Sequence, residues 1–559
     1  EFNKEEKNND NKPKYSQKYR SRDNNNGNRN LGDIVNSPIV AVGEYLATSA
    51  NDGMVHIFKQ SGGDKRSYNL KLSYIPGTMP RKDIENKDST LAKELRAFAE
   101  KGYVGDRYGV DGGFVLRRIT DDQDKQKHFF MFGAMGLGGR GAYALDLTKA
   151  ENGDPTAVSL FDVKHDNNGK NSNNSVQLGY TVGTPQIGKT HDGKYAAFLA
   201  SGYATKDIDN SENKTALYVY DLESSGTLIK KIDVPGGKGG LSSPTLVDKD
   251  LDGIVDIAYA GDRGGNMYRF DLSGQDPNQW SVRTIFSGNK PITSAPAISQ
   301  LKDKRVVIFG TGSDLSEEDV DSKEIQHVYG IFDNDTDTGT AQDGQGKGLL
   351  EQKLEKDKDG KTLFLSDYKR SDGSGDKGWV VKLEAGQRVT VKPTVVLRTA
   401  FVTIHKYTGN DKCGAETAIL GINTADGGKL TKKSARPIVP ADNTAVAQYS
   451  GHKKTSSGKS IPIGCMEKDN GIVCPNGYVY DKPVNVRYLD EKKTDGFSTT
   501  ADGDAGGSGT FKEGKKPARN NRCFSRKGVR TLLMNDLDSL DITGPMCGMK
   551  RISWREVFY

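Results

Sequence analysis

The stretch that decides the fold runs from Ser242 to Leu272 and reads SSPTLVDKDLDGIVDIAYAGDRGGNMYRFDL. It contains short apolar segments separated by glycine turns, a pattern typical of antiparallel strands. It also contains an acidic loop, with aspartates at positions 248, 250, 252 and 256 and a glycine at position 253. The first feature recurs along the chain, whereas the second is complete only in this stretch.

A unit of the same kind recurs from residue 31 onward. It opens with a residue, usually small, that precedes proline, continues as an apolar strand, turns through glycine, and closes with an alternating strand that often ends in Asp. The openings are Ser37-Pro38, Thr184-Pro185, Ser243-Pro244, Ala295-Pro296 and Lys392-Pro393. The closings are Met54–Phe58, Ala142–Asp146, Leu217–Asp221, Met267–Asp271, Val328–Asp333 and Ala418–Asn423.

These repeats predict the fold class. Strands with a period of two, repeated at irregular intervals of roughly 50 to 90 residues, indicate an all-β β-propeller whose blades carry loop insertions. A β-sandwich would not need the same unit six times. We therefore expect a propeller with one acidic blade loop.

The composition agrees with an all-β body that carries solvated loops. The hydrophobic fraction is 34% and the mean hydropathy is −0.68, both low for one compact body. The 66 glycines follow no three-residue period and therefore indicate turns rather than collagen. A net charge of +6 is mild and does not argue for a nucleic-acid partner. The sequence contains no apolar run of about 18 residues that would span a membrane as a helix.

The domain organisation follows from changes in composition. Residues 1–30 are rich in Asn and Lys and predict a disordered linker, because such a segment buries too little apolar surface to offset its ordering entropy. We expect residues 31–559 to form the propeller, with polar insertions at 164–175 and 424–520. One amphipathic helix is predicted at Ser89–Lys101. The chain starts without Met or a signal peptide, which suggests a mature fragment or an expressed piece of a longer protein.

The five cysteines form no CxxC pair, so the spacing of a zinc site is absent; they are Cys413, Cys465, Cys474, Cys523 and Cys547. Cys465 and Cys474 bracket a short polar loop, where a local disulfide would suit an exported protein. Five unrelated thiols are the alternative, and the sequence leaves both open.

The acidic loop predicts a calcium site. Alternate side chains of a tightly wound loop converge on one point, and a glycine at the sixth position supplies the sharp turn. Four clustered carboxylates would repel one another without a cation. A solvated acidic turn is the alternative, but it would not need Gly at that position and Asp at every ligand position. The expected ligands of Ca²⁺ are Asp248, Asp250, Asp252, the backbone carbonyl of Ile254, and Asp256.

The loop is not an EF-hand, and a second loop only echoes it. The twelfth position is Tyr259 instead of Glu, so water or another residue must replace the bidentate ligand, and we expect a weaker affinity than that of a cytosolic buffer. Asp333, Asp335 and Asp337 repeat part of the spacing without the fourth aspartate. That segment is more typical of a turn than of a second metal site.

Several motifs resemble catalytic sites but lack the necessary context. Gly183–Thr190 matches the phosphate-binding P-loop, yet a turn and a strand follow where that loop requires a helix. Glycines at 136, 138 and 141 match the dinucleotide fingerprint, but again a strand follows. Gly507–Gly509 surrounds Ser508 in a polar run with no strand before it. We therefore expect no nucleotide, no catalytic residue and no enzyme.

Seven segments, taken together and in this order, resemble the C-terminal domain of the PilC/PilY family of type IV pilus tip-associated adhesins. They are Leu31–Pro38, Asn51–Phe58, Gly138–Thr148, Gly240–Leu272, Pro291–Ser299, Val307–Leu315 and Arg551–Glu556. The resemblance implies a modified, about seven-bladed propeller in an exported protein at the pilus tip or the bacterial outer-membrane surface. It implies roles in pilus extension and retraction, twitching motility and attachment to host cells.

The same resemblance implies partners and a metal. Minor pilins at the tip and a host-cell surface receptor are the expected partners. The loop at 248–256 corresponds to the calcium site of the family, where binding and release adjust pilus retraction.

A quinoprotein-like propeller dehydrogenase is the main alternative function, and glycan binding by the polar loops is a weaker one. Such an enzyme needs a tryptophan that stacks on its cofactor, and often an adjacent pair of cysteines. This chain has three tryptophans, Trp280, Trp379 and Trp554, and no two adjacent cysteines. The sequence therefore favours a binding module over this enzyme.

Overall fold

The computed structural model describes most of residues 31–429, residues 505–514, and short strands elsewhere. The gaps within 31–429 are 64–66, 79–107, 152–153, 167–174, 204–213, 302, 337–338, 345–347, 357–362, 370–374, 397 and 409–413. The predicted helix at Ser89–Lys101 and the Cys465–Cys474 pair fall outside the described residues. So does the predicted linker, apart from the two-residue strands β1 (Asp23–Asn24) and β2 (Gly27–Asn28).

The chain divides into two compact units. The first unit consists of Glu1–Pro296 together with Asp504–Pro517, and the second of Ala297–Gly503 together with Ala518–Tyr559. The acidic loop at 248–256 therefore belongs to the first unit. The short segment Asp504–Pro517 also belongs to it, although it lies far beyond the loop in the sequence.

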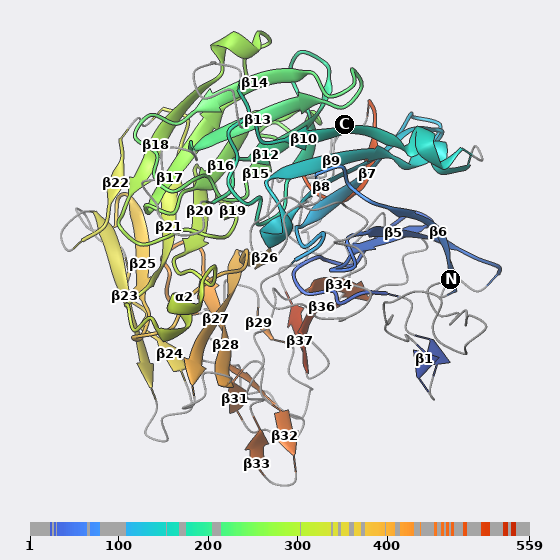
Figure 1. The fold of residues 1–559 in the computed structure, drawn as a ribbon. Coiled ribbons are helices and arrows are strands. Elements are labelled where there is room, and N and C mark those ends of the chain that lie inside the picture. Colours follow the sequence, from blue (N-terminus) through green and yellow to red (C-terminus); the bar gives the residue numbers. More distant parts are fainter. Residues whose placement is uncertain are drawn as a thin grey trace, which may run out of the picture. The chain divides into compact units, whose positions relative to one another are not determined.

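Besides the two-stranded sheet of β1 and β2, the described part of the first unit contains four sheets, each built mainly from four antiparallel strands that are consecutive in the chain (Figure 1). The first two sheets comprise β3 (Val40–Val42), β4 (Tyr45–Ser49), β5 (Val55–Gln60) and β6 (Tyr68–Tyr74), then β7 (Phe114–Thr120), β8 (Gln126–Ala134), β9 (Gly141–Asp146) and β10 (Ser159–Lys164). The next two comprise β11 (Gln186–Lys189), β12 (Tyr195–Ala200), β13 (Ala216–Asp221) and β14 (Leu228–Asp233), then β15 (Thr245–Val247), β16 (Ile257–Gly261), β17 (Asn266–Asp271) and β18 (Ser281–Ser287).

The second unit contributes three further sheets of three or more strands. One pairs β19 (Ala297–Gln300), β20 (Arg305–Gly310), β21 (His327–Asp333) and β25 (Gly378–Lys382), and adds β23 (Leu349–Lys356) and β24 (Leu363–Leu365). Another pairs β26 (Thr394–Val396), β27 (Thr399–Thr408) and β28 (Gly414–Asn423). The last orders β29 (Arg436–Pro437), β37 (Asp538–Thr543), β36 (Val529–Met534) and β34 (Val484–Tyr488). The helix α2 (Glu317–Asp321) also belongs to this unit.

The sequence repeat coincides with the sheets. All six predicted closings fall on the third strand of a sheet, which is β5, β9, β13, β17, β21 or β28. Four of the five predicted openings directly precede a first strand, which is β11, β15, β19 or β26, and Ser37-Pro38 precedes β3 with one residue between them. The sheet that begins with β7 has no such opening, because Gly112 and Gly113 stand in its place.

The closing aspartates have a structural reason. The carboxylate of Asp221 accepts a hydrogen bond from the backbone N–H of Glu223, and that of Asp271 accepts one from Ser273 N–H. Asp146 accepts in the same way from Thr148 N–H. An aspartate at the end of a strand satisfies the backbone of the turn that follows, which explains its recurrence at this position.

Consecutive sheets of the first unit pack face to face. Along β8, Phe129 and Met131 belong to the cluster shared with the preceding sheet, whereas Phe130 and Phe132 belong to the cluster shared with the following one. Because successive side chains of a strand point to opposite faces, a strand buried on both faces reads as a continuous apolar run. Each fully buried phenylalanine contributes about 1.5–3 kcal/mol through this packing.

Hydrogen bonds also link the starts of successive first strands. Gly113 N–H donates to the Gly183 carbonyl (2.8 Å), and Thr184 N–H donates to Ser243 Oγ (2.9 Å). These bonds place the openings of neighbouring sheets of the first unit side by side, as expected for propeller blades.

The predicted fold class is confirmed. Seven sheets of three or more strands are present, and in the described residues helix is confined to α2 and short 3₁₀ turns. Gly183–Thr190 leads into β11 and then β12 instead of a helix, so the P-loop match is a coincidence of sequence. Gly136–Gly138 is a 3₁₀ turn that leads into β9, as expected for a glycine-rich turn between strands.

Candidate metal site

The acidic loop connects the first two strands of its sheet. Strand β15 ends at Val247 and β16 begins at Ile257, so residues 248–256 form the connection. Gly253 has a φ of +92° and Leu251 a φ of +63°. A leucine in the left-handed region is strained, and the surrounding contacts must hold it there. The loop is therefore tightly wound, as the glycine at position 253 predicts.

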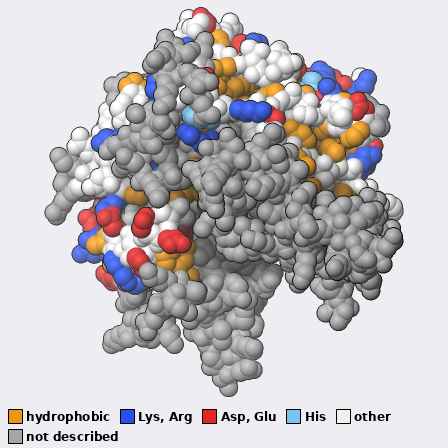
Figure 2. All heavy atoms as spheres, viewed as in Figure 1, with side chains coloured by type: hydrophobic (Ala, Val, Ile, Leu, Met, Phe, Trp, Pro, Cys, Tyr) orange, Lys and Arg blue, Asp and Glu red, His pale blue; other side chains and the backbone are white. Residues whose placement is uncertain are grey.

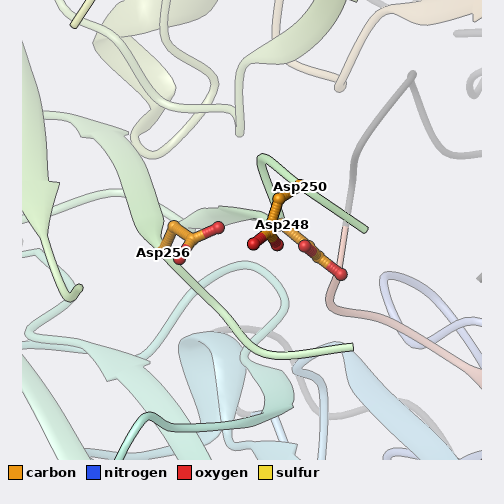
Figure 3. Close-up of side chains that lie close together, drawn as sticks. All are labelled: Asp248, Asp250 and Asp256. Carbon is orange, nitrogen blue, oxygen red and sulfur yellow. The ribbon is translucent and has the colours of Figure 1, made fainter. Parts of the chain in front are cut away.

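Three of the predicted ligands converge. Carboxylate oxygens of Asp248, Asp250 and Asp256 all lie within 4.8 Å of one another. Asp248 and Asp256 are buried, whereas Asp250 is exposed. Figure 3 shows the three side chains converging from the two ends of the loop. The cluster therefore has a buried base and one exposed side.

Asp248 also organises the loop backbone. Its Oδ1 accepts hydrogen bonds from the N–H groups of Leu251 (2.7 Å) and Asp252 (3.2 Å). Its Oδ2 accepts one from Gly253 N–H (2.7 Å). One buried carboxylate thus stabilises the turn and faces the other two acidic side chains.

The other two predicted ligands are placed differently. Asp252 Oδ1 accepts a hydrogen bond from Ile254 N–H (2.8 Å), and its carboxylate lies outside the group of three. Ile254 forms an isolated parallel bridge with Lys189, and the adjacent Val255 N–H donates to the Lys189 carbonyl (2.8 Å). The loop is thereby joined to the end of β11.

The electrostatics of the cluster favour neutralisation. Burial raises the pKa of Asp248 to about 6, and the negative charges of Asp252 and Asp256 act in the same direction. Hydrogen bonds from the Gly253 and Leu251 N–H groups oppose this rise. Among the described residues, no lysine or arginine forms an ion pair with Asp248 or Asp250. A proton or a metal cation would relieve the repulsion between these carboxylates.

No motif in the sequence predicts two neighbours of the loop. His191, in the turn between β11 and β12, contacts Asp256 Oδ1 through Nε2 (2.8 Å). Phe511, from the polar insertion predicted at 424–520, packs against Gly253. Both contacts join residues that are distant in sequence, and neither lies in a spacing pattern that a motif could reveal.

The donor set fits a hard cation that prefers oxygen. Ca²⁺ takes six to eight oxygen ligands in flexible geometry, whereas Mg²⁺ demands near-ideal octahedral geometry. Three carboxylates around one point, of which two are buried, supply oxygens and negative charge without nitrogen or sulfur ligands. The exposed side at Asp250 leaves room for water to complete the shell. Tyr259, at the twelfth position, is buried on β16 and supplies no carboxylate.

The turn at 333–337 repeats part of the aspartate spacing but has different charged neighbours. Asp333 is buried at the end of β21, and Asp335 pairs with the guanidinium of Arg305 (2.5 Å); Asp337 lies outside the described residues. The positive charge of Arg305 thus lies beside this acidic segment, in agreement with the interpretation of the segment as a turn.

The residues that would serve a dehydrogenase are in the core. Trp280 is 5% exposed and donates its indole N–H to the Gly274 carbonyl (2.8 Å). Trp379 is fully buried and donates to the Thr424 carbonyl (2.9 Å). Neither indole offers a free face on which a cofactor could stack, and Trp554 lies outside the described residues.

A histidine network in the first sheet has a structural role. His56 contacts Asp52 Oδ2 through Nε2 (2.8 Å) and Ser73 Oγ through Nδ1 (2.9 Å). Asp52 also accepts hydrogen bonds from the N–H groups of Gly32 and Met54. The carboxylate therefore anchors the turn between β4 and β5, and the histidine links that turn to β6.

Charged side chains of both signs lie on the visible face of the described residues. On the face drawn in Figure 2, acidic and basic side chains of the described residues are interspersed. This distribution agrees with the mild net charge of +6. No helix in the described part of the chain is long and apolar enough to cross a membrane.

Comparisons with known proteins identify the family. Residues 31–369 match the family model described as the PilY1 beta-propeller domain. Type IV pilus biogenesis factor PilY1 of Pseudomonas aeruginosa PAO1 is 30% identical over 371 residues, which cover 55% of this chain and 29% of that protein. A type IV pilus biogenesis factor PilY1 homolog from Xylella fastidiosa is 28% identical over 319 residues, which cover 52% of this chain and 19% of that protein.

A solved structure agrees with the family model. The crystal structure of the Pseudomonas aeruginosa PilY1 C-terminal domain matches with a TM-score of 0.55 and 21% identity, covering 90% of this chain and 93% of that one. At this identity the likeness concerns the fold. This chain spans less than a third of the length of the curated relatives it matches. Because the family model covers more than half of the chain, the chain belongs to the PilY1 β-propeller family.

Proposed function

We propose that this chain is the C-terminal propeller of a protein that acts in type IV pilus biogenesis and adhesion. Two curated relatives carry the name type IV pilus biogenesis factor or its homolog, and the family model covers the sheets that hold the acidic loop. The partners in this proposal are pilus components, with minor pilins at the tip, and a host-cell surface receptor. The protein acts outside the cell, at the pilus tip or the outer-membrane surface.

The proposed activity is calcium-dependent binding without catalysis. The observation that carries it is the convergence of Asp248, Asp250 and Asp256 around one point, with Asp248 and Asp256 buried and a raised pKa for Asp248. Ca²⁺ at this point is held by these carboxylates, joined by Asp252, the Ile254 carbonyl and water. Its binding and release regulate extension and retraction of the pilus, twitching motility and adherence.

Calcium titration by calorimetry on chelated protein tests the metal proposal, with Mg²⁺ in parallel. The informative variant is Asp250→Asn, because Asp250 is exposed and, among the described residues, accepts a single hydrogen bond, from Asp252 N–H (3.3 Å). The matched control is Asp276→Asn, an exposed aspartate in the connection between β17 and β18 of the same sheet, which accepts from Asn278 N–H. One saturable calcium site in the wild type and the control, lost in Asp250→Asn, supports the proposal. Equal binding in all three proteins refutes the site.

Piliation of the source organism tests the pilus proposal. We expect deletion of residues 31–559 to reduce surface pili and twitching. Asp250→Asn in the full-length protein should change twitching while the protein level stays the same. Normal piliation, twitching and adherence after the deletion would overturn this function. A deletion defect without an effect of Asp250→Asn would leave calcium as a structural ion.

A further inference from the structure

Residues 505–514 return to the first unit and dock on its second sheet. Strand β35 (Gly509–Lys512) pairs in parallel with the second half of β7, from Gly509 opposite Arg117 to Lys512 opposite Thr120. It is the orange-red strand beside β7 in Figure 1. The sequence predicted this stretch as part of a polar insertion that decorates the propeller. The structure instead makes it the fifth strand of a sheet.

The segment touches the first strands of three consecutive sheets. Leu116 N–H on β7 donates to Ser508 Oγ (3.0 Å). Gly506 packs so closely against Gln186 on β11 that an added Cβ would lie 2.4 Å from its Oε1. Ala505 N–H donates to the carbonyl of Leu246 (2.9 Å), on the strand that leads into the acidic loop. The segment therefore spans the distance from the second sheet to the loop.

Side chains hold the end of the segment in place. Glu513 contacts the hydroxyl of Tyr195 and the ammonium of Lys127, while its N–H donates to the Thr120 carbonyl (2.9 Å). Lys512 pairs with Asp124 (2.7 Å). Hydrogen bonds at both ends and a four-residue strand pairing give the segment a single register.

Phe511 carries the contact with the acidic loop. A Cβ placed on Gly253 would lie 2.8 Å from Cζ of this ring, so the ring covers the glycine directly. The guanidinium of Arg117 lies 5.2 Å from the ring centroid, and the ring of Tyr195 meets it edge-on at 6.3 Å. The ring is thus fixed by neighbours from β7 and β12 while it covers the sharpest point of the loop.

We propose that docking of residues 505–514 positions the acidic loop for its cation, and that cation binding in turn strengthens the docking. The N–H of Gly253 donates to Asp248 Oδ2, so a shift of this glycine moves a carboxylate of the cluster. Leu251 and Gly253 both have a positive φ, and the like charges of the cluster favour an opened loop. Phe511 opposes that opening. Since coupling between two binding events is reciprocal, the loop and the segment stabilise each other. The cation half of this inference rests on the proposed function.

Hydrogen–deuterium exchange on the whole chain without metal tests the docking half. The informative variant is Phe511→Ala. The matched control is Phe161→Ala, since Phe161 is also half-buried and packs against the same hydrophobic cluster but not against the loop. We expect the amides of Leu251, Asp252 and Gly253 to exchange about fivefold faster or more in Phe511→Ala, and within about twofold of wild type in the control. No change in Phe511→Ala, or an equal change in both variants, overturns the inference.

A second variant guards against global unfolding. Ala505→Pro removes the N–H that donates to Leu246 and leaves Phe511 intact. A folded Ala505→Pro protein should show the same faster exchange in the loop, with thermal melting as the check on folding. Normal loop exchange in this variant, with faster exchange of residues 505–514 themselves, overturns the coupling.

Calcium titration of the same variants separates the two proposals. We expect Phe511→Ala to weaken calcium binding about fivefold or more, and calcium to slow exchange at 505–514 in the wild type. Equal calcium affinity in wild type and Phe511→Ala overturns the inference and leaves the metal site standing. Absence of calcium binding in the wild type overturns the proposed function. In that case, amide exchange of residues 251–253 without metal still decides whether the segment 505–514 positions the loop.

Discussion

Two acidic turns of this chain share a spacing of aspartates but differ in what faces them. In the turn after β21, Asp335 pairs with Arg305, an arginine of the same sheet. In the loop after β15, Asp248 and Asp250 face further carboxylates, and no described lysine or arginine pairs with them. The difference shows that the same aspartate spacing can face either an arginine or further carboxylates. We propose that an external cation binds at 248–256, where no described lysine or arginine pairs with Asp248 or Asp250.

The largest expected effect is the loss of calcium binding in Asp250→Asn. Removing one carboxylate from a cluster of three should weaken binding by at least about 100-fold, so that calcium no longer stabilises the protein. In the wild type, calcium at 100 times its dissociation constant should add about 2.7 kcal/mol to the free energy of unfolding. Thermal melting with and without calcium measures the difference. An equal calcium-induced shift in Asp250→Asn would contradict the comparison.

The acidic loop at 248–256 should also make the free energy of unfolding depend on pH, through Asp248. The folded pKa of Asp248 is about 6, above the ordinary value of 3.8, so the folded state binds more protons between about pH 4 and 6. Without calcium, Asp248 therefore makes the protein less stable as pH rises through this window, by about 3 kcal/mol. The free energy of unfolding of wild type minus that of Asp248→Asn, measured across pH 4–7, should fall by this amount. A difference that rises with pH would have the wrong sign.

The same titration should weaken calcium binding in acid. Protonation of Asp248 competes with the cation, so affinity should fall as pH drops below about 6 and stay constant above about 7. Calorimetry at pH 5 and pH 7.5 checks this expectation. The same affinity at both values would show that Asp248 is not a ligand.

His191 should have a smaller effect than the carboxylates. Its ring holds Asp256 by a hydrogen bond, and partners of ligands typically contribute about tenfold to metal affinity. We expect His191→Ala to weaken calcium binding by about this factor, with recovery in His191→Asn if the amide restores the contact. An unchanged affinity in His191→Ala would show that Asp256 needs no such support.

The smallest expected effect is the change in the free energy of unfolding caused by Asp335→Asn, and its sign distinguishes the two acidic turns. Asp335→Asn removes an ion pair with a buried arginine and should lower the free energy of unfolding by about 1 kcal/mol, because Asp335 itself is 42% exposed. Without calcium at pH 7.5, Asp248→Asn should raise it instead, since the mutation relieves repulsion. Urea unfolding of both variants compares the signs. Stabilisation by Asp335→Asn would show that Arg305 does not neutralise that turn.

Local sequence patterns made the third strands of the sheets predictable. The third strands carry period-two apolar residues and an aspartate that caps the following turn, as in Leu217–Asp221. The sheet that begins with β7 lacked its opening signal because Gly112 and Gly113 replace the residue–proline pair. The outer strand β6 exposes Leu70 and other side chains, so its pattern is weaker than that of the inner strands.

Only the part of the candidate site that lies within one loop was predictable from the sequence. Asp248, Asp250 and Asp256 converge because one loop carries them, and the spacing expresses that geometry. Asp252 turns to Ile254 N–H, which a spacing pattern cannot foresee. Phe511 reaches the loop because β35 pairs with β7, and His191 lies near the isolated bridge between Lys189 and Ile254. Both contacts join residues that are far apart in sequence. The polar stretch around Phe511 carries no alternation that would predict a strand or its register.

Calcium titration of chelated wild-type protein, with Asp250→Asn and Asp335→Asn alongside, tests the central claim most directly. The comparison of the two turns predicts one saturable site in the wild type, its retention in Asp335→Asn and its loss in Asp250→Asn. Calcium binding that survives Asp250→Asn but disappears in Asp335→Asn would contradict the account, because it would move the cation to the turn that already holds Arg305.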